Sequence, residues 1–564
     1  MFMHALHSSV GRTENVRRTV VGLCVAAAFT LLLNAVSLRS LAHGRLTITE
    51  LGLDNISADE AHYFAMIKDA SEGSLNLGNT SLKEHRSDPN VSTFAPLLQG
   101  SLMRFFGLRL ESVIFLGDIL FPFLGAFILF SILSAFRFPI VDAALITLFS
   151  LSSVAWQRSV NPQISVPLLL LCIGLFLLSF RASKRQLLLQ GLLTALLVFV
   201  HVLYAEFLIA SELVLLGLRL LFIPKNRRSV FQRSMLTLFP PLVACGIKIL
   251  ITGSMPPGIS VDTYRRLGAI PSHLPAAPMM QLTIFATIAL FLLLRKKRLC
   301  GVSPIFDGIS LLLFGGLLCL NQSVVSGFDL VFGLYFAVPI VILLRMMWLA
   351  LLLAFTPAPL LLRRVLAALL VIFALLLSLP GLGNRSSRND SYDALIASLV
   401  SEPKTEEVIL APIEISNLIP VLTSHFVVFN QYAHFEPALD SELTDRFLLE
   451  KSLFPIVRED KDPLFSWVFG LYAGNLAART KTACRFEAFF THENCSRDPR
   501  SFIIHQDLLQ RLEAGTVDRR TMLKKFQVDL IISENKLPSD IRSLCPLTKT
   551  VGSYRIYRCG TLSP

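Results

Sequence analysis

Residues 164–180 read ISVPLLLLCIGLFLLSF, an apolar run in which no side chain carries a charge. A helix needs about 20 such residues to cross the hydrocarbon core of a bilayer, which is about 30 Å thick. Similar blocks recur along the chain, for example at Val20–Val36, Pro278–Leu294 and Val365–Leu379. Their repetition predicts a polytopic α-helical membrane protein. Because many blocks follow the first one, a cleaved signal peptide at the N-terminus would not change this class.

Composition supports this class. Of the 564 residues, 53% are hydrophobic and 16% are charged, and the mean hydropathy is +0.60. Soluble domains carry about 25% charged residues. The net charge of +12 is compatible with a nucleic-acid partner, but the basic residues cluster in short gaps between apolar blocks, as in cytoplasmic loops of membrane proteins. We therefore expect the lipid bilayer as a partner, and no nucleic acid.

The basic residues alternate between gaps, which predicts an orientation. Every second gap is basic, whereas the intervening short gaps hold only Arg158, Arg265 and Arg266. By the positive-inside rule, the N-terminus is cytoplasmic and the first long loop is outside. The basic clusters are Arg12/Arg17/Arg18, Arg137, Arg181/Lys184/Arg185, Lys225/Arg227/Arg228/Arg233, Arg295/Lys296/Lys297/Arg298 and Arg363/Arg364.

One block decides the number of spans. Leu187–Phe222 is mostly apolar and would be about 54 Å long as one helix, too long for one crossing. Both flanks are basic and therefore expected on the same side, so we predict two helices with a break near His201–Glu206. The total is then about eleven transmembrane helices, and an odd number leaves the C-terminus outside.

The composition becomes that of a soluble protein from Gly381 onward. Strands are predicted at 407–411, 425–429, 527–533 and 551–558, and helices at 414–422, 439–453 and 502–512. This alternation predicts a C-terminal extracytoplasmic α/β domain. The organisation is thus a cytoplasmic N-terminus (1–18), a transmembrane domain (19–380) that includes the first outer loop (38–90), and the α/β domain (381–564). The α/β domain has no Gly-rich phosphate loop and no nucleophile elbow, so we expect chemistry in the membrane part.

Four cysteines lie in this C-terminal domain: Cys484, Cys495, Cys545 and Cys559. In an oxidising compartment they can form two disulfides, and Cys484–Cys495 with Cys545–Cys559 is the simplest of three pairings. No Cys-x-x-Cys spacing occurs, so the cysteines do not indicate a zinc site.

The first outer loop contains the most informative motif. Ser57 and Glu60 form a capping-box pattern at the start of a helix, and the carboxylate of Asp59 is favoured in the first turn by the helix dipole. Ala61, Phe64 and Ile67 then recur on one face. From these residues alone, a structural role for the two carboxylates is about as well supported as a chemical one.

The segment Asp59-Glu60-Ala61-His62-Tyr63 resembles the Asp-Glu motif of the GT-C class of membrane glycosyltransferases, which includes protein O-mannosyltransferases and the aminoarabinose transferase of lipid A. Further segments resemble the class in the expected order. They are Phe94–Leu97, Arg158–Pro162, Asn321–Gly327, and the strands around 526–529 and 554–557. Each motif is short, but together they cover most of the chain.

The resemblance implies a glycosyltransferase of a bacterial inner membrane. Its donor would be a polyprenyl-phosphate-linked sugar, and its acceptor a glycan, lipid or protein at the extracytoplasmic face. Asp59 would be the general base, with Glu60 as its neighbour. Because a helix N-terminus lowers the pKa of a carboxyl group and weakens it as a base, Asp54 and Asp88 are alternatives. The loop has no Asp-x-Asp pair, so neither a divalent metal nor another cofactor is implied.

A leaving phosphate needs cations, and the candidates are Arg158, Lys248, Arg265 and Arg266. Lys248 lies inside a span, where function is the default hypothesis; an ion pair with Glu206 or Glu212 is the alternative. Candidates for contact with the sugar or the acceptor are His201, Tyr204, Glu206, Asn321 and Gln322, although a polar cap on a helical hairpin also explains the first three. We expect internal pairs for Asp118, Asp142, Asp307 and Arg345.

Two other functions compete with this hypothesis. One is a transporter or flippase of a lipid-linked sugar, but the sequence lacks the paired halves with broken spans that many transporters show. The other is a non-catalytic protein of envelope-polysaccharide assembly. Substitution of Asp59 separates the last hypothesis from the enzyme.

Overall fold

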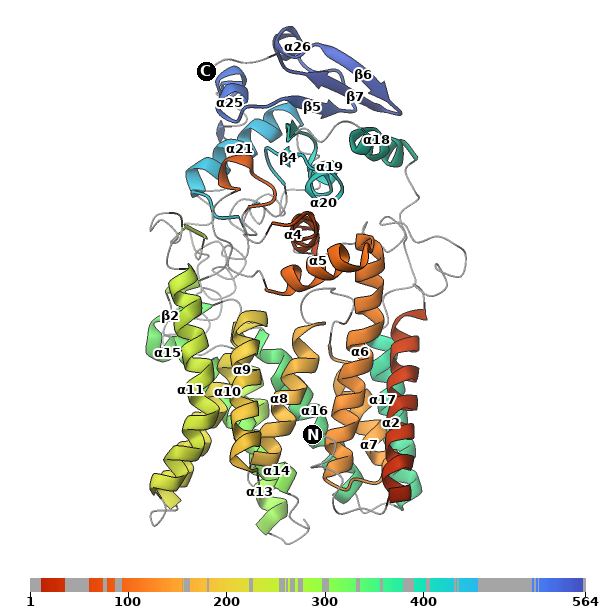
Figure 1. Cartoon of the computed structure of the whole chain (residues 1–564), viewed down its shortest axis with the longest axis vertical. Coiled ribbons are helices and arrows are strands. Elements are labelled where there is room, and N and C mark those ends of the chain that lie inside the picture. The colour runs from red at the N-terminus through yellow and green to blue at the C-terminus, as the bar shows by residue number, and fades with distance from the viewer. Residues whose placement is uncertain are drawn as a thin grey trace, which may run out of the picture.

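The computed structural model describes most of the chain. The described residues are 12–35, 60–74, 79–86, 94–154, 156, 163–179, 182–222, 227–252, 259, 262–263, 269–271, 277–296, 304–330, 335–355, 359–378, 390–401, 406–430, 433, 436–454, 510–511, 514–515 and 517–560. Two layers are stacked along the long axis: a bundle of helices, and above it a smaller domain that contains a sheet (Figure 1).

Seven helices of the bundle are long and apolar enough to cross a membrane. They are α2 (Arg12–Leu33), α6 (Leu110–Ala135), α11 (Arg227–Thr252), α13 (Pro278–Lys296), α14 (Pro304–Leu320), α16 (Ala337–Phe355) and α17 (Leu360–Ser378). Four further helices stand among them: α7 (Ile140–Leu151), α8 (Ser165–Leu178), α9 (Lys184–Val200) and α10 (Val202–Phe222).

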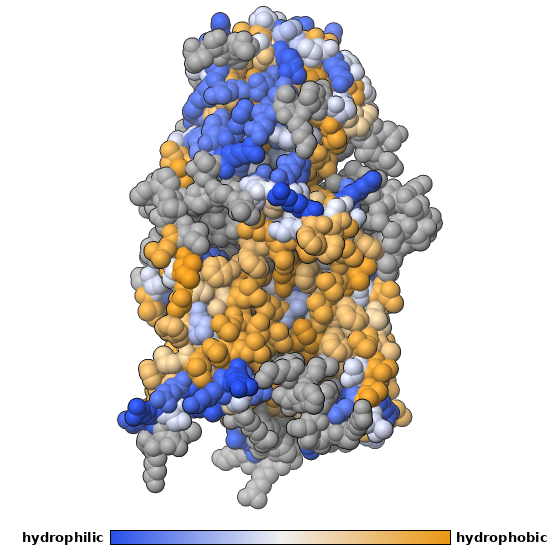
Figure 2. Space-filling view, in the orientation of Figure 1, coloured by the Kyte–Doolittle hydropathy of each residue, from blue (hydrophilic) through white to orange (hydrophobic). Residues whose placement is uncertain are grey.

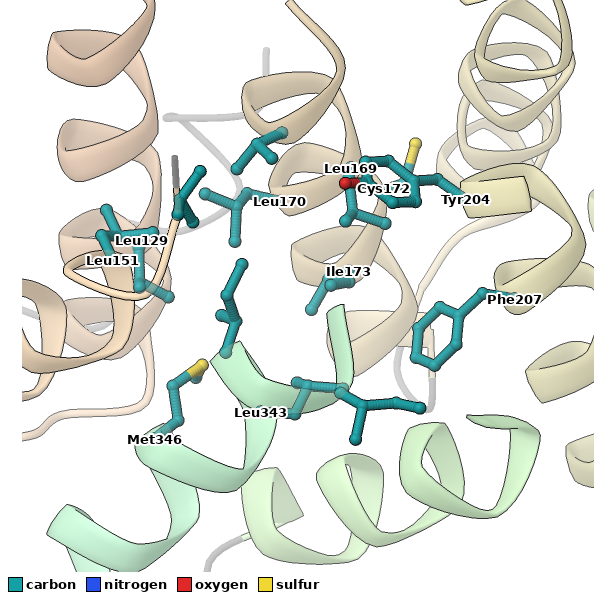
Figure 3. Close-up of a cluster of buried hydrophobic side chains, with 14 of the residues drawn as sticks. Leu129, Leu151, Leu169, Leu170, Cys172, Ile173, Tyr204, Phe207, Leu343 and Met346 are labelled. Atoms are coloured by element: carbon teal, nitrogen blue, oxygen red, sulfur yellow. The ribbon is translucent and has the colours of Figure 1, made fainter. Parts of the chain in front are cut away.

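Helix α8, from the stretch that opened the sequence analysis, lies in the centre of the bundle. Almost all of its side chains are buried, as expected for a helix that is apolar all round. Figure 3 shows Leu169, Leu170 and Ile173 of α8 among side chains of the neighbouring helices, such as Phe207 and Leu343. The core of the bundle is therefore built around this helix.

Outer helices of the bundle expose their apolar side chains. Helix α17, for example, leaves Leu361 and Leu377 more than two-thirds exposed. On the face seen in Figure 2, a broad hydrophobic belt covers the bundle, with hydrophilic surface above and below it. A belt of this kind is unfavourable in water and matches hydrocarbon. The chain is a multi-pass integral membrane protein.

The long apolar block from 187 to 222 forms two antiparallel helices. His201 has an extended backbone between α9 and α10 (φ −158°, ψ 92°). Gln190 Nε2 donates to Glu212 Oε1 although the two residues are 22 positions apart, with His201 midway between them. This contact requires the chain to reverse at His201, so the predicted break is confirmed.

The ends of the bundle that lie away from the sheet domain are joined by basic residues. Arg364 forms an ion pair with Asp142 at 2.9 Å, and Arg295 forms one with Asp307 at 2.6 Å. Both acids thus make the internal pairs that we expected. Arg345 instead hydrogen-bonds the Phe149 carbonyl and the Ser152 hydroxyl, so its partners are neutral.

Two helices lie between the bundle and the sheet domain (Figure 1): α4 (Glu60–Glu72), from the first outer loop, and α5 (Phe94–Phe106), which follows that loop. Helix α5 is amphipathic. It buries Ala95, Gln99 and Met103, whereas Phe105 and Phe106 are exposed. The short helix η2 (Lys83–His85) follows α4.

The C-terminal domain contains a five-stranded mixed sheet with the order β4-β3-β5-β7-β6. Its strands are β3 (Val408–Leu410), β4 (Phe426–Val427), β5 (Leu530–Ser533), β6 (Leu547–Val551) and β7 (Tyr554–Arg558). β3 pairs in parallel with β4 and β5, while β7 is antiparallel to β5 and β6. The predicted α/β class is confirmed, although β6 was not predicted.

Short helices surround this sheet. They are α18 (Asp390–Ser401), α19 (Ile413–Ser416), α20 (Ile419–Leu422), α21 (Asp440–Leu453), α25 (Arg519–Lys525) and α26 (Ser539–Leu544). Cys545 and Cys559 form a disulfide between the end of α26 and the end of β7. Cys484, Cys495 and most of the predicted helix 502–512 lie outside the described residues.

The first outer loop is part of the C-terminal domain's core. Leu82 is fully buried among Phe429, Leu443 and Phe447 of that domain. The Ser81 carbonyl accepts a hydrogen bond from the Val427 amide of β4 at 2.8 Å. The described residues of 60–86 and of 390–560 therefore form one folded unit, which we call the outer unit.

Two further loops, which follow α11 and α14, are also tied to their neighbours. β1 (Ala269–Pro271) pairs antiparallel with β2 (Phe328–Leu330), which joins the loops that follow α11 and α14. Asp262 accepts a hydrogen bond at 3.0 Å from the amide of Asp440, the first residue of α21. A carboxylate at this position is favoured by the dipole of α21.

Candidate functional site

Several predicted site residues lie outside the described part of the chain, and their positions are not discussed: Asp54, Asp59, Asp88, Arg158, Arg265 and Arg266. The described candidates are Glu60, His201, Tyr204, Glu206, Lys248, Asn321 and Gln322. They lie at the ends of spans that face the outer unit, in three groups.

The first group is acidic. Glu60 is the first residue of α4 and is half-buried. Its charge acts on Asp118, which lies about two turns inside α6. The Gln163 amide donates to the Asp118 carboxylate and to the Trp156 carbonyl. Asn34, just after α2, donates to the Asp118 carbonyl at 2.7 Å. Two carboxylates are thus close enough to repel each other where α2, α4, α6 and the segment before α8 converge.

This environment of Asp118 differs from the expected internal ion pair. The partner of its carboxylate is the neutral amide of Gln163, and the nearby charge of Glu60 has the same sign. The signal in the sequence is an acid inside an apolar span, which marks a candidate functional residue. Gln163 has no such signal, because its role depends on how the chain folds back before α8.

The second group surrounds the reversal between α9 and α10. The His201 ring stacks on Tyr204, with centroids 3.8 Å apart, and Tyr335 meets it edge-on at 5.2 Å. Lys248, in the last turn but one of α11, donates to the Val198 carbonyl at 3.1 Å, and its charge acts on His201. A cation and a histidine are therefore held side by side at the outer end of the bundle.

The two glutamates suggested as partners of Lys248 have other surroundings. Glu212 accepts a hydrogen bond from Gln190, deeper in the bundle. Glu206 is half-buried, and its charge acts on Cys245 and Cys319. Tyr204 is completely buried (Figure 3). Its ring therefore packs in the core of the bundle.

The third group is a pair of amides. Asn321 Nδ2 donates to Gln281 Oε1 at 3.1 Å, and Gln281 Nε2 donates back to Asn321 Oδ1 at 3.3 Å. This pair joins the end of α14 to the start of α13. Gln322 begins the short helix α15 (Gln322–Ser326) and is half-buried. Sequence reasoning missed Gln281, since nothing in its own helix marks it.

Above these groups, charged residues hold the first outer loop against the C-terminal domain. His62 Nδ1 lies 3.3 Å from Glu436 Oε1, and both side chains are buried. Arg446 hydrogen-bonds Glu84 at 2.7 Å and Glu442 at 2.9 Å. Burial alone would raise the pKa of Glu442. The hydrogen bond from His85 and the charge of Arg446 outweigh burial and lower this pKa to about 2.

Chemically, the arrangement offers a base and a cation at one level of the molecule. The acidic group can accept a proton, and Lys248 can stabilise negative charge. Within the described ranges, no cluster of three or more His, Cys, Asp or Glu side chains suits a metal ion. No protein-family model and no curated protein sequence matches this chain.

Proposed function

We propose that the protein is a membrane glycosyltransferase of the GT-C type that uses a polyprenyl-phosphate-linked sugar at the extracytoplasmic face. In this proposal the seven long helices and α7–α10 make eleven spans, the N-terminus is cytoplasmic, and the outer unit is extracytoplasmic. The observation that supports it best is the position of Glu60. The Asp-Glu motif ends at the boundary between the bundle and the outer unit, beside Asp118 of a span.

The boundary suits a donor with an isoprenoid tail. The tail stays in the hydrocarbon while the phosphate and the sugar reach the outer end of the spans. Lys248 lies at that level, within the last turns of α11, where a cation can bind the phosphate of the donor. His201, whose ring stacks on Tyr204, is close enough to Lys248 for its charge to act on the imidazole and is a candidate for contact with the donor's head group.

The proposed reaction is a single displacement at the anomeric carbon. Asp59 takes the proton of the acceptor hydroxyl while the hydroxyl oxygen forms a bond to the anomeric carbon. The bond between that carbon and the phosphate oxygen breaks, and polyprenyl phosphate leaves with the electron pair. Glu60, the next residue in the sequence, adds a negative charge near the base, which raises its proton affinity. This repulsion opposes the effect of the helix dipole on Asp59.

The test is Asp59→Asn, which removes the base but keeps the size of the side chain. It is produced in cells that lack the native protein, and envelope glycans are compared by mass spectrometry at equal membrane levels of protein. We expect loss of a glycosylated product with Asp59→Asn and normal product with the control Asp445→Asn on α21. Normal product with Asp59→Asn would contradict the enzyme and favour a role in assembly.

A further inference from the structure

The ends of α9, α10 and α11 that lie away from the outer unit carry a group of basic side chains. The lower end of α11 stands at the lower left of Figure 1, and hydrophilic surface covers the same corner of the molecule in Figure 2. The three helices contain two acidic residues, Glu206 and Glu212, and Glu206 lies near the opposite end of α10. The basic residues, which we call the basic end, are Lys184, Arg185, Arg219, Arg227, Arg228 and Arg233.

The basic end has a surplus of positive charge. Elsewhere at this level of the bundle, arginines have carboxylate partners, as in the Arg18–Glu14 contact at 3.0 Å and the two ion pairs described above. Within α9, α10 and α11, the carboxylate nearest to the basic end is that of Glu212, which already accepts a hydrogen bond from Gln190. One carboxylate cannot balance six cations.

Close packing of the helices holds some of these cations together. Gly191 of α9 lies against α11, since a Cβ atom there would be 2.3 Å from the Leu236 carbonyl oxygen. Arg233 Nη2 donates to the Ala182 carbonyl, just before α9, at 2.7 Å. Arg219 of α10 is half-buried and close enough to Arg233 for the two charges to repel each other. A bound anion relieves such repulsion, and guanidinium groups are strong ligands of phosphate.

Exposed aromatic rings stand beside the cations. Phe222 is three residues after Arg219 and is 78% exposed, and Phe231 is three residues after Arg228 and is 50% exposed. A spacing of three places both members of each pair on one side of their helix. A soluble anion would leave these rings in water, whereas the acyl chains of a lipid cover them. Cations and apolar rings on one surface therefore indicate a lipid.

We propose that the basic end binds a phospholipid whose headgroup has a net negative charge. Its phosphate lies against the guanidinium groups of Arg219 and Arg233, and its acyl chains pass Phe222 and Phe231 toward the hydrophobic belt. A zwitterionic headgroup carries its own ammonium group and compensates less of the surplus charge. Basic pockets between transmembrane helices suit anionic headgroups for this reason. The inference does not depend on glycosyl transfer, because it uses only the helices and their basic end.

Lipid affinity can be measured by native mass spectrometry on the full-length protein in detergent micelles. The probes are dioleoylphosphatidylglycerol, which is anionic, and dioleoylphosphatidylcholine, which is zwitterionic. The test variant is Arg227→Gln/Arg228→Gln, which removes two exposed charges of the basic end. The matched control is Arg17→Gln/Arg137→Gln, which removes two exposed arginines on α2 and after α6, at the same level of the bundle.

We expect the native protein to bind the anionic lipid about tenfold more tightly than the zwitterionic lipid. Each basic residue near an anionic headgroup contributes about fivefold in affinity. The test variant should therefore bind the anionic lipid about thirtyfold more weakly, whereas the control should stay within about threefold of the native protein. Equal affinity of the native protein for the two lipids, or an equal loss in both variants, would overturn the proposal.

Two further measurements examine the guanidinium pair and the acyl chains. Arg233→Gln should weaken binding of the anionic lipid by about fivefold, and if this variant does not fold, Arg227→Gln/Arg228→Gln decides. Inorganic pyrophosphate serves as a soluble anion and should bind much more weakly than the anionic lipid. Binding of pyrophosphate as tightly as the lipid would show that the acyl chains contribute nothing and would overturn a lipid as the occupant.

Discussion

His85 of the first outer loop contacts both carboxylate oxygens of Glu442 on α21, at 3.0 and 2.9 Å, although the two residues are 357 positions apart. Six apolar helices with spanning length separate them in the sequence: α6, α11, α13, α14, α16 and α17. The contact means that the acidic motif before His85 and the C-terminal domain lie on the same side of the membrane.

The outer unit should lose stability when the loop's apolar anchor is removed. Leu82→Ala truncates a fully buried side chain. Such a truncation lowers the free energy of unfolding by about 2–5 kcal/mol. Leu547→Ala, at a position that is 52% exposed, should change stability by less than about 0.5 kcal/mol. Urea unfolding, monitored by the susceptibility of the outer unit to protease, measures the stability of both variants. Equal stability of the two variants would show that the loop is not part of the core.

Low pH should weaken the contacts of Glu442 with His85 and Arg446. Its pKa is lowered from 4.5 to about 2 on folding, which corresponds to about 3 kcal/mol of stability. Because the folded-state pKa is lowered, this stability is present above about pH 4.5 and is lost as the pH falls toward 2. The difference in unfolding free energy between the native protein and Glu442→Gln should shrink over that window. A difference that stays constant from pH 7 to pH 3 would contradict this assignment.

The Cys545–Cys559 disulfide closes a loop with a sequence separation of 14. Replacing both cysteines with Ala should destabilise the outer unit by about 3 kcal/mol, because the unfolded chain regains loop entropy. The measurement is urea unfolding with and without a reductant. Reductant should lower the stability of the native protein to that of the double variant, and no effect of either change would contradict the prediction.

Substitutions of Asp118 and Asp142 test which end of the bundle carries the proposed glycosyl transfer. Asp118 lies beside Glu60, whereas Asp142 pairs with Arg364 at the other end. Asp118→Asn should lower the rate of transfer by about a hundredfold, as for loss of a group that supports a catalytic base. Asp142→Asn should affect stability but leave the rate of the folded protein within about twofold. Equal rates for both variants would exclude Asp118 from the site.

Much of the bundle can be predicted from sequence, because a helix that crosses the hydrocarbon core of a bilayer needs about 20 apolar residues. The break at His201 follows from length and from charge at both flanks, and the Gln190–Glu212 contact agrees with it. Helix α7 is shorter than its apolar block suggests, since its regular structure ends at Leu151. Of the eleven predicted spans, seven are described helices with spanning length, so the apolar blocks do not fix where each helix ends.

The candidate site is harder to predict, because its residues come from segments that pair only after folding. Asp118 and Gln163, or Gln281 and Asn321, have no shared pattern in the sequence. The same holds for Leu82, which resembles an ordinary loop residue but packs into a domain more than 300 residues away. Strand β6 was missed since its side chains are mostly exposed, and it lacks the apolar signal of a buried strand.

The central claim is that the acidic loop helix and the C-terminal domain face the extracytoplasmic side. It is tested most directly by labelling intact cells with a membrane-impermeant maleimide after introducing single cysteines at exposed positions. Glu72→Cys on α4 and Thr550→Cys on β6 should be labelled in intact cells, and Arg228→Cys at the start of α11 only after permeabilisation. Labelling of Arg228→Cys in intact cells, with protection of the other two, would contradict the account.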